Sequence, residues 1–276
     1  MLDVETWPEL RQPILVVALG GWVDAGMAGA EAADLIRDQM GAGRRFARLD
    51  LADFVDLQQT RPDVEIVDGV TRRVSWPEIE CVAGRAGRDV VVVTGPEPSL
   101  RWPTVVAELV AMARRLDVVA AYGLGAMPSM TTHRQRIPVL ATATDAVLAE
   151  EVGALRTDYV GVTGLQTALM VALGAAGIPS VGLWAQVPHY LAGSPSPPAT
   201  RAVLGRLVEL AGIELDLDDL DRAAERYAVK VEAGLAERPD VAELVQAIEA
   251  EHPAMPSGDE LMTEIERFLR SQPDQD

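Results

Sequence analysis

Apolar residues recur along the chain in short runs that end in glycine, proline, histidine or tryptophan. The clearest run begins at Ile14, where ILVVAL is followed by two glycines, a tryptophan, an aspartate and a further glycine. Similar runs reach Gly95, Gly123, Gly164 and Trp184. A short apolar run bounded in this way is typical of a buried strand. The pattern therefore predicts a series of buried strands, each leading into a turn.

Segments with helical periodicity alternate with these strands. In residues 26–40, for example, Ala28, Ala32 and Ile36 recur on one side, which predicts an amphipathic helix stopped by the glycines that follow. Strands are predicted at 14–19, 48–51, 89–94, 118–122, 137–142 and 179–186, and helices at 26–40, 102–116, 145–152, 163–174 and 198–211. This alternation predicts a three-layer α/β fold with a mainly parallel central sheet.

Two segments depart from the regular alternation. The dipeptide Asp68-Gly69 lies between two β-prone runs, at 64–67 and 71–76, and predicts a β-hairpin. The predicted helix at 163–174 is almost entirely apolar, so it is expected either to lie against the sheet or to form a subunit interface.

The last quarter of the chain is acidic and helical in pattern. Residues 214–276 carry 18 acids and 6 bases, within a chain whose formal charge is −18. Amphipathic helices are predicted at 215–238 and 239–251, with a third at 260–270. We expect an α/β domain over residues 1–213 and an acidic helical extension over residues 214–276 that docks on it.

Composition excludes several classes of protein. With 276 residues, 49% hydrophobic and 24% charged, the chain resembles an ordinary globular protein. No apolar run is long enough for a membrane helix and the first residues do not resemble a signal peptide, so we expect a cytoplasmic protein. The acidic balance disfavours nucleic acid and anionic membranes as partners.

The sequence offers few residues for a metal site or a reactive thiol. Cys81 is the only cysteine and stands in the apolar stretch IECVAG, which favours a buried thiol over a nucleophile. Only three histidines are present, at positions 133, 189 and 252. We therefore expect neither a metal site nor a cofactor.

Candidate functional residues lie in five loops that follow predicted strands. In parallel sheets, ligands bind beyond the carboxyl ends of the strands. The loops span residues 20–26, 95–102, 123–136, 158–164 and 187–196. The rim candidates they supply are Gly21, Trp22, Asp24, Glu97, Trp102, His133, Arg134, Arg136, Tyr159, His189 and Tyr190.

Each group of candidates has a structural as well as a functional interpretation. The glycine-rich first loop could cradle a phosphate, but Asp24 would repel an anion and is equally suited to capping the helix that follows. His133 with its neighbouring arginines forms a positive patch that suits an anionic ligand or an acidic subunit. His189 could be a general base, and Asp24, Glu97 and Asp158 could supply a carboxylate pair. The aromatic side chains are more often packing residues than a stacking site.

At these loops the chain resembles the PAC2 family, the proteasome assembly chaperone 2 group, and in particular its bacterial and archaeal branch. The matching stretches follow the family order and cover nearly the whole chain: GGWVDAG at 20–26, GPEPSLRW at 95–102, LGAMPSMTTHRQRIPV at 124–139, YVGVTGLQTAL at 159–169 and LWAQVPHYLAGSPSPPA at 183–199. The resemblance implies a fold similar to purine nucleoside phosphorylases without their catalytic set, and assembly into homo-oligomers.

Two functional hypotheses follow. The first is a non-enzymatic, homo-oligomeric protein, expected as a trimer or a multiple of it, that binds other proteins in the manner of an assembly chaperone. The alternative is a small-molecule binder, or a hydrolase-like or phosphorylase-like enzyme, that acts on a nucleoside-like or anionic ligand at the rim.

Overall fold

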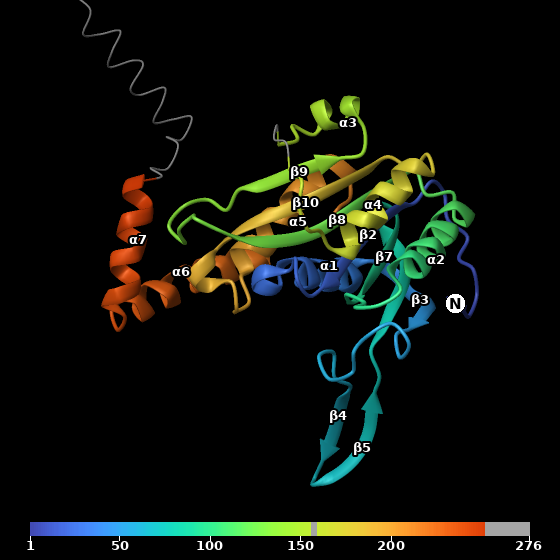
Figure 1. The fold of residues 1–276 in the computed structure, drawn as a ribbon, viewed down its shortest axis with the longest axis horizontal. Helices are drawn as coiled ribbons and strands as arrows, with labels where there is room; N and C mark the ends of the chain where they lie inside the picture. Colours follow the sequence, from blue (N-terminus) through green and yellow to red (C-terminus); the bar gives the residue numbers. More distant parts are fainter. Residues whose placement is uncertain (156–158, 252–276) are drawn as a thin grey trace, which may run out of the picture.

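The computed structural model describes residues 1–155 and 159–251, which form an eight-stranded sheet, a separate two-stranded hairpin and covering helices (Figure 1). The strands are β1 (Asp3–Val4), β2 (Ile14–Gly20), β3 (Gly41–Asp50), β4 (Asp63–Val67), β5 (Val70–Ser75), β6 (Glu78–Ala86), β7 (Arg88–Pro96), β8 (Ala120–Ser129), β9 (Val139–Ala143) and β10 (Ser180–Pro188). The helices are η1 (Ala25–Met27), α1 (Ala28–Gln39), α2 (Trp102–Arg115), α3 (Ala146–Glu151), α4 (Leu165–Ala175), η2 (His189–Leu191), α5 (Pro197–Ala211), α6 (Asp218–Leu235) and α7 (Pro239–Glu251).

The large sheet has a parallel centre and antiparallel edges. Its order is β1-β3-β6-β7-β2-β8-β10-β9. The four adjacent strands β7, β2, β8 and β10 are parallel to one another. The neighbours β1 and β3, β3 and β6, and β6 and β7 pair antiparallel, as do β10 and β9. The predicted α/β fold with its central sheet between helical layers is confirmed. The likeness to nucleoside phosphorylases is not confirmed and stays a prediction.

Two apolar cores lie on opposite faces of the sheet. Val16 faces the core beneath α1 and α5, where Ile36 is fully buried. Its neighbour Val17 faces the other core, together with Leu109 of α2 and Leu169 of α4. Successive residues of a strand point to opposite faces, so the run of buried residues in β2 serves both cores. The apolar character of α4 is thus explained largely by packing against the sheet.

Several predicted boundaries are wrong, for identifiable reasons. The short strand predicted at 48–51 is the end of the longer β3, which already begins at Gly41. Strand β6 was not predicted, because charged residues interrupt its apolar alternation. Strand β8 runs on to Ser129, although its glycines suggested a loop from Gly123. A Cβ atom at Gly123 would lie 3.0 Å from the amide nitrogen of Gln166, so this glycine makes room for a side chain within the strand.

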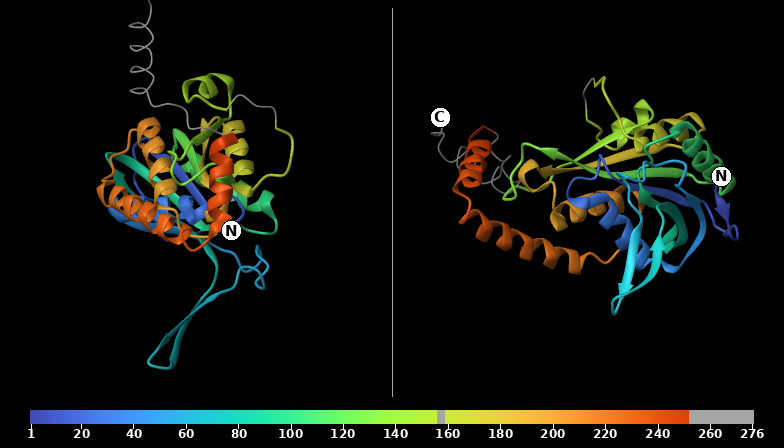
Figure 2. Two further views of the ribbon diagram at one scale, coloured as in Figure 1. Left: turned by 90° about the vertical axis from the view of Figure 1, so that its left-hand side faces the viewer. Right: turned by 60° about the horizontal axis from the view of Figure 1, so that its bottom comes forward.

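The predicted hairpin is confirmed and forms an arm that projects from the body (Figures 1 and 2). We use "the arm" for β4, β5 and the turn between them. At the turn, Asp68 and Gly69 have φ angles of 50° and 75°. Positive φ at both central residues is the requirement of a type I′ turn, whose twist matches that of the flanking strands. The same dipeptide that marked the hairpin in the sequence therefore also sets its geometry.

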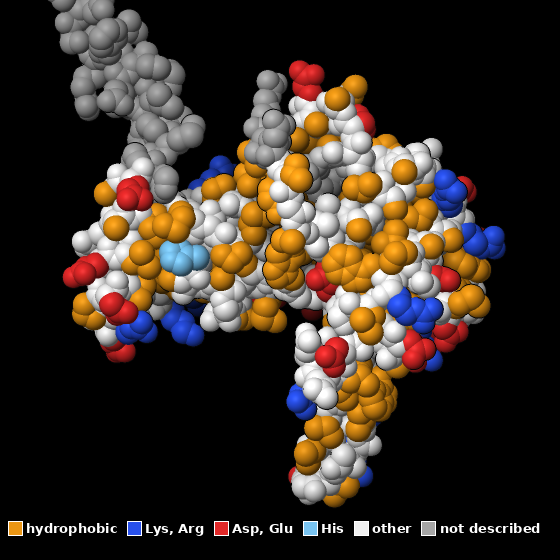
Figure 3. All heavy atoms as spheres, viewed as in Figure 1, with side chains coloured by type: hydrophobic (Ala, Val, Ile, Leu, Met, Phe, Trp, Pro, Cys, Tyr) orange, Lys and Arg blue, Asp and Glu red, His pale blue; other side chains and the backbone are white. Residues whose placement is uncertain are grey.

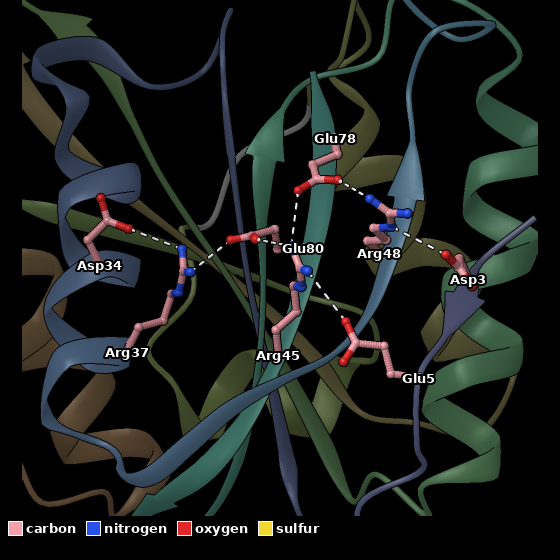
Figure 4. A network of polar contacts seen from close by, with 8 residues as sticks. All are labelled: Asp3, Glu5, Asp34, Arg37, Arg45, Arg48, Glu78 and Glu80. Carbon is pink, nitrogen blue, oxygen red and sulfur yellow. Dashed lines mark hydrogen bonds and ion pairs between the residues drawn. The ribbon is translucent and has the colours of Figure 1, made fainter. Parts of the chain in front are cut away.

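An ion-pair network holds together the edge of the sheet from which the arm emerges (Figure 4). Arg45 on β3 lies 3.3 Å from Glu78 and 3.1 Å from Glu80, both on β6. Arg37 of α1 reaches Glu80 at 2.8 Å. A single ion pair at this degree of exposure contributes little to stability, but linked pairs restrict the positions of several elements at once. The network therefore fixes the position of β3 and β6, whose ends lead into the arm.

The described C-terminal helices follow the outside of the body (Figure 2). Helix α6 packs along α5, where Leu220 joins the core and Arg201 pairs with Asp221 at 2.7 Å. Helix α7 lies at the end of the molecule remote from the N-terminus (Figure 1). The third predicted helix, at 260–270, lies outside the described residues. Within the part of the chain that is described, no helix combines the length and apolarity needed to cross a membrane.

Cys81 should be chemically inert in the folded protein. Its side chain is fully buried on β6, and burial raises the pKa of the thiol to about 12. Because the thiolate is the reactive form, we expect no reaction with a thiol reagent at pH 8 in the native state, and stoichiometric labelling once guanidinium unfolds the chain. Ellman's assay checks both states. Rapid labelling without denaturant would contradict the buried placement.

Candidate functional site

The loops that follow the parallel strands meet at one rim of the sheet. The Gly26 amide donates to the Ala192 carbonyl at 2.8 Å, and the Ser196 amide donates to the Gly26 carbonyl at 2.9 Å. On the other side of β2, the Glu97 amide donates to the Gly20 carbonyl at 2.8 Å. These bonds join the first, second and fifth of the predicted loops. The rim is therefore continuous across β7, β2 and β10.

Asp24 caps the helix that follows the first loop. Its Oδ1 accepts a hydrogen bond from the Gly29 amide at 2.6 Å, and its Oδ2 accepts from the Ala30 amide at 3.3 Å. Burial raises the pKa of Asp24, and the two amide bonds act in the opposite direction. A phosphate bound here would need the amides that Asp24 already occupies. The local geometry thus supports the capping interpretation rather than the phosphate cradle.

Glu97 performs the same task for a different helix. Its Oε1 accepts from the Leu165 amide at 2.6 Å, at the start of α4. A Cβ atom at Gly164 would lie 2.8 Å from this oxygen, so the glycine lets the carboxylate reach the helix end. Gly21 also lies against Glu97, since a Cβ atom there would be 3.2 Å from the Cβ atom of Glu97. Asp24 and Glu97 therefore serve the amino ends of two separate helices, which is not the arrangement of a catalytic pair.

Gln166 fills the point at which the parallel strands diverge. Strands β2 and β8 pair only as far as Val17 and Gly123, and in sheets of this kind a ligand crevice opens where neighbouring strands part. The Gln166 side chain is 1% exposed; its Nε2 donates to the Leu124 carbonyl at 3.1 Å and its Oε1 accepts from the Leu19 amide at 3.4 Å. The crevice is thus occupied by the protein itself.

The two histidines of the rim meet at Tyr190. The Nδ1 atom of His133 lies 2.7 Å from the Tyr190 hydroxyl, and the His133 amide donates to the same oxygen at 3.1 Å. The His189 ring packs edge-on against Tyr190 with 5.6 Å between ring centroids. The His133 side chain is only 2% exposed, and its Nε2 lies 3.0 Å from Glu232 of α6. Both ring nitrogens of His133 are therefore engaged by other side chains.

The positive patch beside His133 receives acids from the C-terminal helices. Arg134 binds Glu232 through Nε at 2.6 Å and Nη2 at 3.1 Å. Its Nη1 reaches Glu249 of α7 at 3.3 Å, and Thr132 donates to the other oxygen of Glu249 at 3.1 Å. The sequence predicted an anionic ligand or an acidic subunit here. In the structure, the chain's own helices supply the acids.

The remaining candidates are dispersed. Trp22 is largely exposed, the Trp102 indole donates to the Pro98 carbonyl, and the Tyr159 hydroxyl donates to the Val162 carbonyl. Arg136 lines a different hollow of about 1080 Å³, between the loop after β8 and α5. Asp158 lies outside the described residues. In the described ranges, 1–155 and 159–251, no group of three or more His, Cys, Asp or Glu side chains is placed to hold a metal ion.

Three residues that shape the rim were not among the candidates. Gln166 could have been suspected, because it is a polar residue in an otherwise apolar helix. Glu232 and Glu249 could not, because they are two acids among many on helices with repeated acidic positions. Only the docking of α6 and α7 against the loop after β8 distinguishes them from their neighbours.

Comparison with known proteins identifies relatives of the chain. The PAC2 family model matches residues 18–233. A proteasome-assembly chaperone homologue from Mycobacterium tuberculosis is 36% identical, with a TM-score of 0.77 over 84% of this chain and 99% of its own. A PAC2 family protein from Streptomyces avermitilis is 38% identical, with the same TM-score and coverage. The archaeal proteasome activator PbaB from Pyrococcus furiosus, 21% identical with a TM-score of 0.67 over 84% of this chain and 97% of its own, shares the fold. Curated proteins give no match.

Replacing Gln166 should destabilise the fold. Gln166→Leu keeps the side-chain volume close to that of glutamine but leaves the Leu19 amide and the Leu124 carbonyl without this partner. We expect the free energy of unfolding to fall by about 1–3 kcal/mol, the usual cost of unpaired buried polar groups. Urea unfolding followed by circular dichroism measures the change. Val171→Ala, at an exposed position of the same helix, is the control, and equal midpoints for both variants would contradict the role of Gln166.

The contacts of Glu232 should make stability depend on pH. The hydrogen bond from Arg134, followed by that from His133, lowers the pKa of Glu232 from 4.5 to about 2. A carboxylate with a lowered folded-state pKa adds stability above its unfolded pKa and loses it as the pH falls towards the folded value. Glu232→Gln should therefore lose less stability than the wild type between about pH 4.5 and pH 2. Urea midpoints across this window test the difference, with Glu225→Gln on the same helix as control; parallel curves for Glu232→Gln and wild type would refute it.

Proposed function

Because the chain belongs to the PAC2 family, we propose that it is a non-enzymatic protein-binding factor that self-associates, as a trimer or a multiple of it, and acts in the manner of an assembly chaperone. The support for an assembly role is the likeness to the Mycobacterium tuberculosis proteasome-assembly chaperone homologue over most of both chains. A cytoplasmic location fits a chain with a single, buried cysteine.

The observation that carries this proposal is that side chains at the rim are hydrogen-bonded within the protein. Asp24 and Glu97 cap helices, and His133 is held between Tyr190 and Glu232. A general base or nucleophile needs a reactive atom directed at a substrate position. Asp24 and His133 instead have both of their polar side-chain atoms bonded to the protein, and Glu97 has its Oε1 bonded to a helix amide. The rim is thus suited to hold loops in place and present a defined surface.

Two surfaces of the described chain support protein binding. Helix α6 carries acids in its first turn, at Asp218, Asp219 and Asp221, and such a surface favours partners with basic patches. The arm carries apolar side chains that are exposed on both of its strands. Exposed apolar surface of this kind is characteristic of protein interaction sites.

The alternative, a small-molecule binder or phosphorylase-like enzyme, is not favoured. It requires a crevice at the carboxyl ends of β2 and β8, and Gln166 lies across that position. It also requires an anion site at the first loop, where Asp24 holds the helix amides. Both requirements conflict with contacts already made within the chain.

A thermal-shift screen separates the two functions, because only the alternative predicts stabilisation by small ligands. A ligand at 100 times its Kd adds about 2.7 kcal/mol, or about 5–10 °C in Tm for a domain of this size. We expect Tm shifts below about 1 °C for nucleosides, nucleotides, inorganic phosphate and divalent cations, well below the shift that a bound ligand would cause. A reproducible shift of several degrees with a nucleoside or phosphate would reverse the preference.

A further inference from the structure

A large hollow lies between the loop after β8, the start of β9 and helix α5. Its volume of about 1080 Å³ is at the upper end of the range of about 300–1,000 Å³ for ligand pockets. Met130 and Leu140 give its wall apolar surface. Neither Asp24, Glu97 nor Gln166 lines it, so it is separate from the crevice at β2 and β8. The hollow is large enough to receive a short segment of another chain.

The wall of this hollow is basic in an otherwise acidic protein. Its charged lining residues are Arg136, Arg201, Arg206 and Glu209. Three positive charges less one negative charge give +2, whereas the whole chain carries −18. On the face of the molecule drawn in Figure 3, basic side chains stand singly or in small groups. A hollow with these few basic groups attracts a carboxylate, but it is not the broad basic surface that nucleic acid needs.

Arg136 is the arginine of the wall that is available to a ligand. Arg201 is held by Asp221 at 2.7 Å, and Arg206 is held by Glu209 at 2.8 Å. The Arg136 side chain is exposed, and among the described residues it has no ion-pair partner. Its guanidinium group can therefore donate hydrogen bonds to a carboxylate that another molecule brings.

The start of β9 adds unpaired backbone groups. Strand β9 lies at the edge of the sheet, beside β10 (Figure 1). The Gln186 amide donates to the Pro138 carbonyl at 2.9 Å, and the two kinds of residue pair alternate along antiparallel strands. Val139 is therefore directed away from β10, as is Ala141, whose carbonyl accepts from the Leu155 amide at 2.9 Å. In the part of the chain that is described, the N–H and C=O groups of Val139 have no partner on this outer side.

Gln186 gives the wall a further polar group without a partner. Its side chain lines the hollow, and its Nε2 is buried without a hydrogen bond to any described residue. Nearly all buried polar groups in proteins are hydrogen-bonded. The unpaired amide and the outward backbone of Val139 indicate that the chain does not complete the hydrogen bonding of this wall by itself. Unpaired groups on an edge strand are a template for a further strand.

We propose that the hollow binds an extended segment of a partner protein, whose backbone pairs with Val139 and whose acidic side chain contacts Arg136. The proposal rests on the protein-binding function proposed above and assigns it a surface and a partner chemistry. Extended chain spans about 3.3–3.6 Å per residue, so about three residues of the segment separate the two contacts. In strand addition of this kind, backbone hydrogen bonds supply affinity and side-chain contacts supply specificity. Apolar residues of the segment pack on Met130 and Leu140.

A library of random seven-residue peptides, selected on the full-length chain, tests the surface. Selected peptides should combine Asp or Glu with β-branched or aromatic residues. In fluorescence anisotropy, Arg136→Glu should weaken the Kd of a selected peptide by about tenfold or more, because repulsion replaces attraction. Arg114→Glu makes the same charge change on α2 and should leave the Kd unchanged. Replacing the acid of the peptide by lysine should weaken binding to the wild type and restore binding to Arg136→Glu.

Amide hydrogen exchange tests whether the backbone of β9 takes part. The Val139 amide should exchange rapidly in the free chain, because it points outward, and should become protected when the selected peptide binds. The Leu140 amide, which faces β10, is the internal control and should be protected in both states. No change at Val139 upon binding of a peptide that depends on Arg136 would overturn the strand addition.

The possible results separate this proposal from protein binding in general. Peptides whose Kd is unaffected by Arg136→Glu, or is weakened equally by Arg114→Glu, overturn the hollow as their site but leave protein binding in place. A wild type that selects no peptide also overturns the hollow, and the thermal-shift screen tests the proposed function independently. A lower oligomer mass for Arg136→Glu than for wild type in light scattering would assign the hollow to a second copy and overturn a different protein as its occupant.

Discussion

The central parallel strands need apolar cover on both faces, and most of the architecture follows from this requirement. Neighbouring residues of β2 point into different cores, so each face of the sheet must carry a helical layer. Helices α1 and α5 supply one layer and α2 and α4 the other. Parallel strands also require crossovers, which place the loops after β2, β7, β8 and β10 at one rim.

At that rim, the amino ends of the helices control what the loops can do. A helix begins with backbone amides that have no partner within the helix. In this chain, carboxylates from the loops satisfy them: Asp24 at α1 and Glu97 at α4. Gln166 then spans the gap between β2 and β8. The groups that a catalytic site or an anion site would need at these positions are consequently used to fix the loops.

The surfaces left for partners lie outside the sheet. The acidic helices extend the body at one end, where Glu232 and Glu249 attach them to Arg134. The arm extends it elsewhere and exposes apolar side chains on both of its strands. These surfaces differ in chemistry, one suited to basic partners and the other to apolar contact.

The sequence by itself determined the elements and their order where local patterns are strong. The apolar run at β2, the consecutive valines of β7 and the Asp68-Gly69 turn were each sufficient to predict the element that forms, because burial and turn geometry act on adjacent residues. The capping role of Asp24 was likewise open to prediction, since a cap lies next to its helix. Strand β6 and the extension of β8 were not, because their charged residues and glycines are explained by neighbours distant in the chain.

Only the tertiary structure decided how the candidate residues are used. Glu97 reaches a helix that begins 68 residues later, and His133 meets Tyr190 and Glu232, which are 57 and 99 residues away. The hairpin itself could be predicted from its turn, but its projection from the body of the chain could not. Contacts between distant residues depend on the packing of whole elements, and a single sequence carries no local signal of that packing.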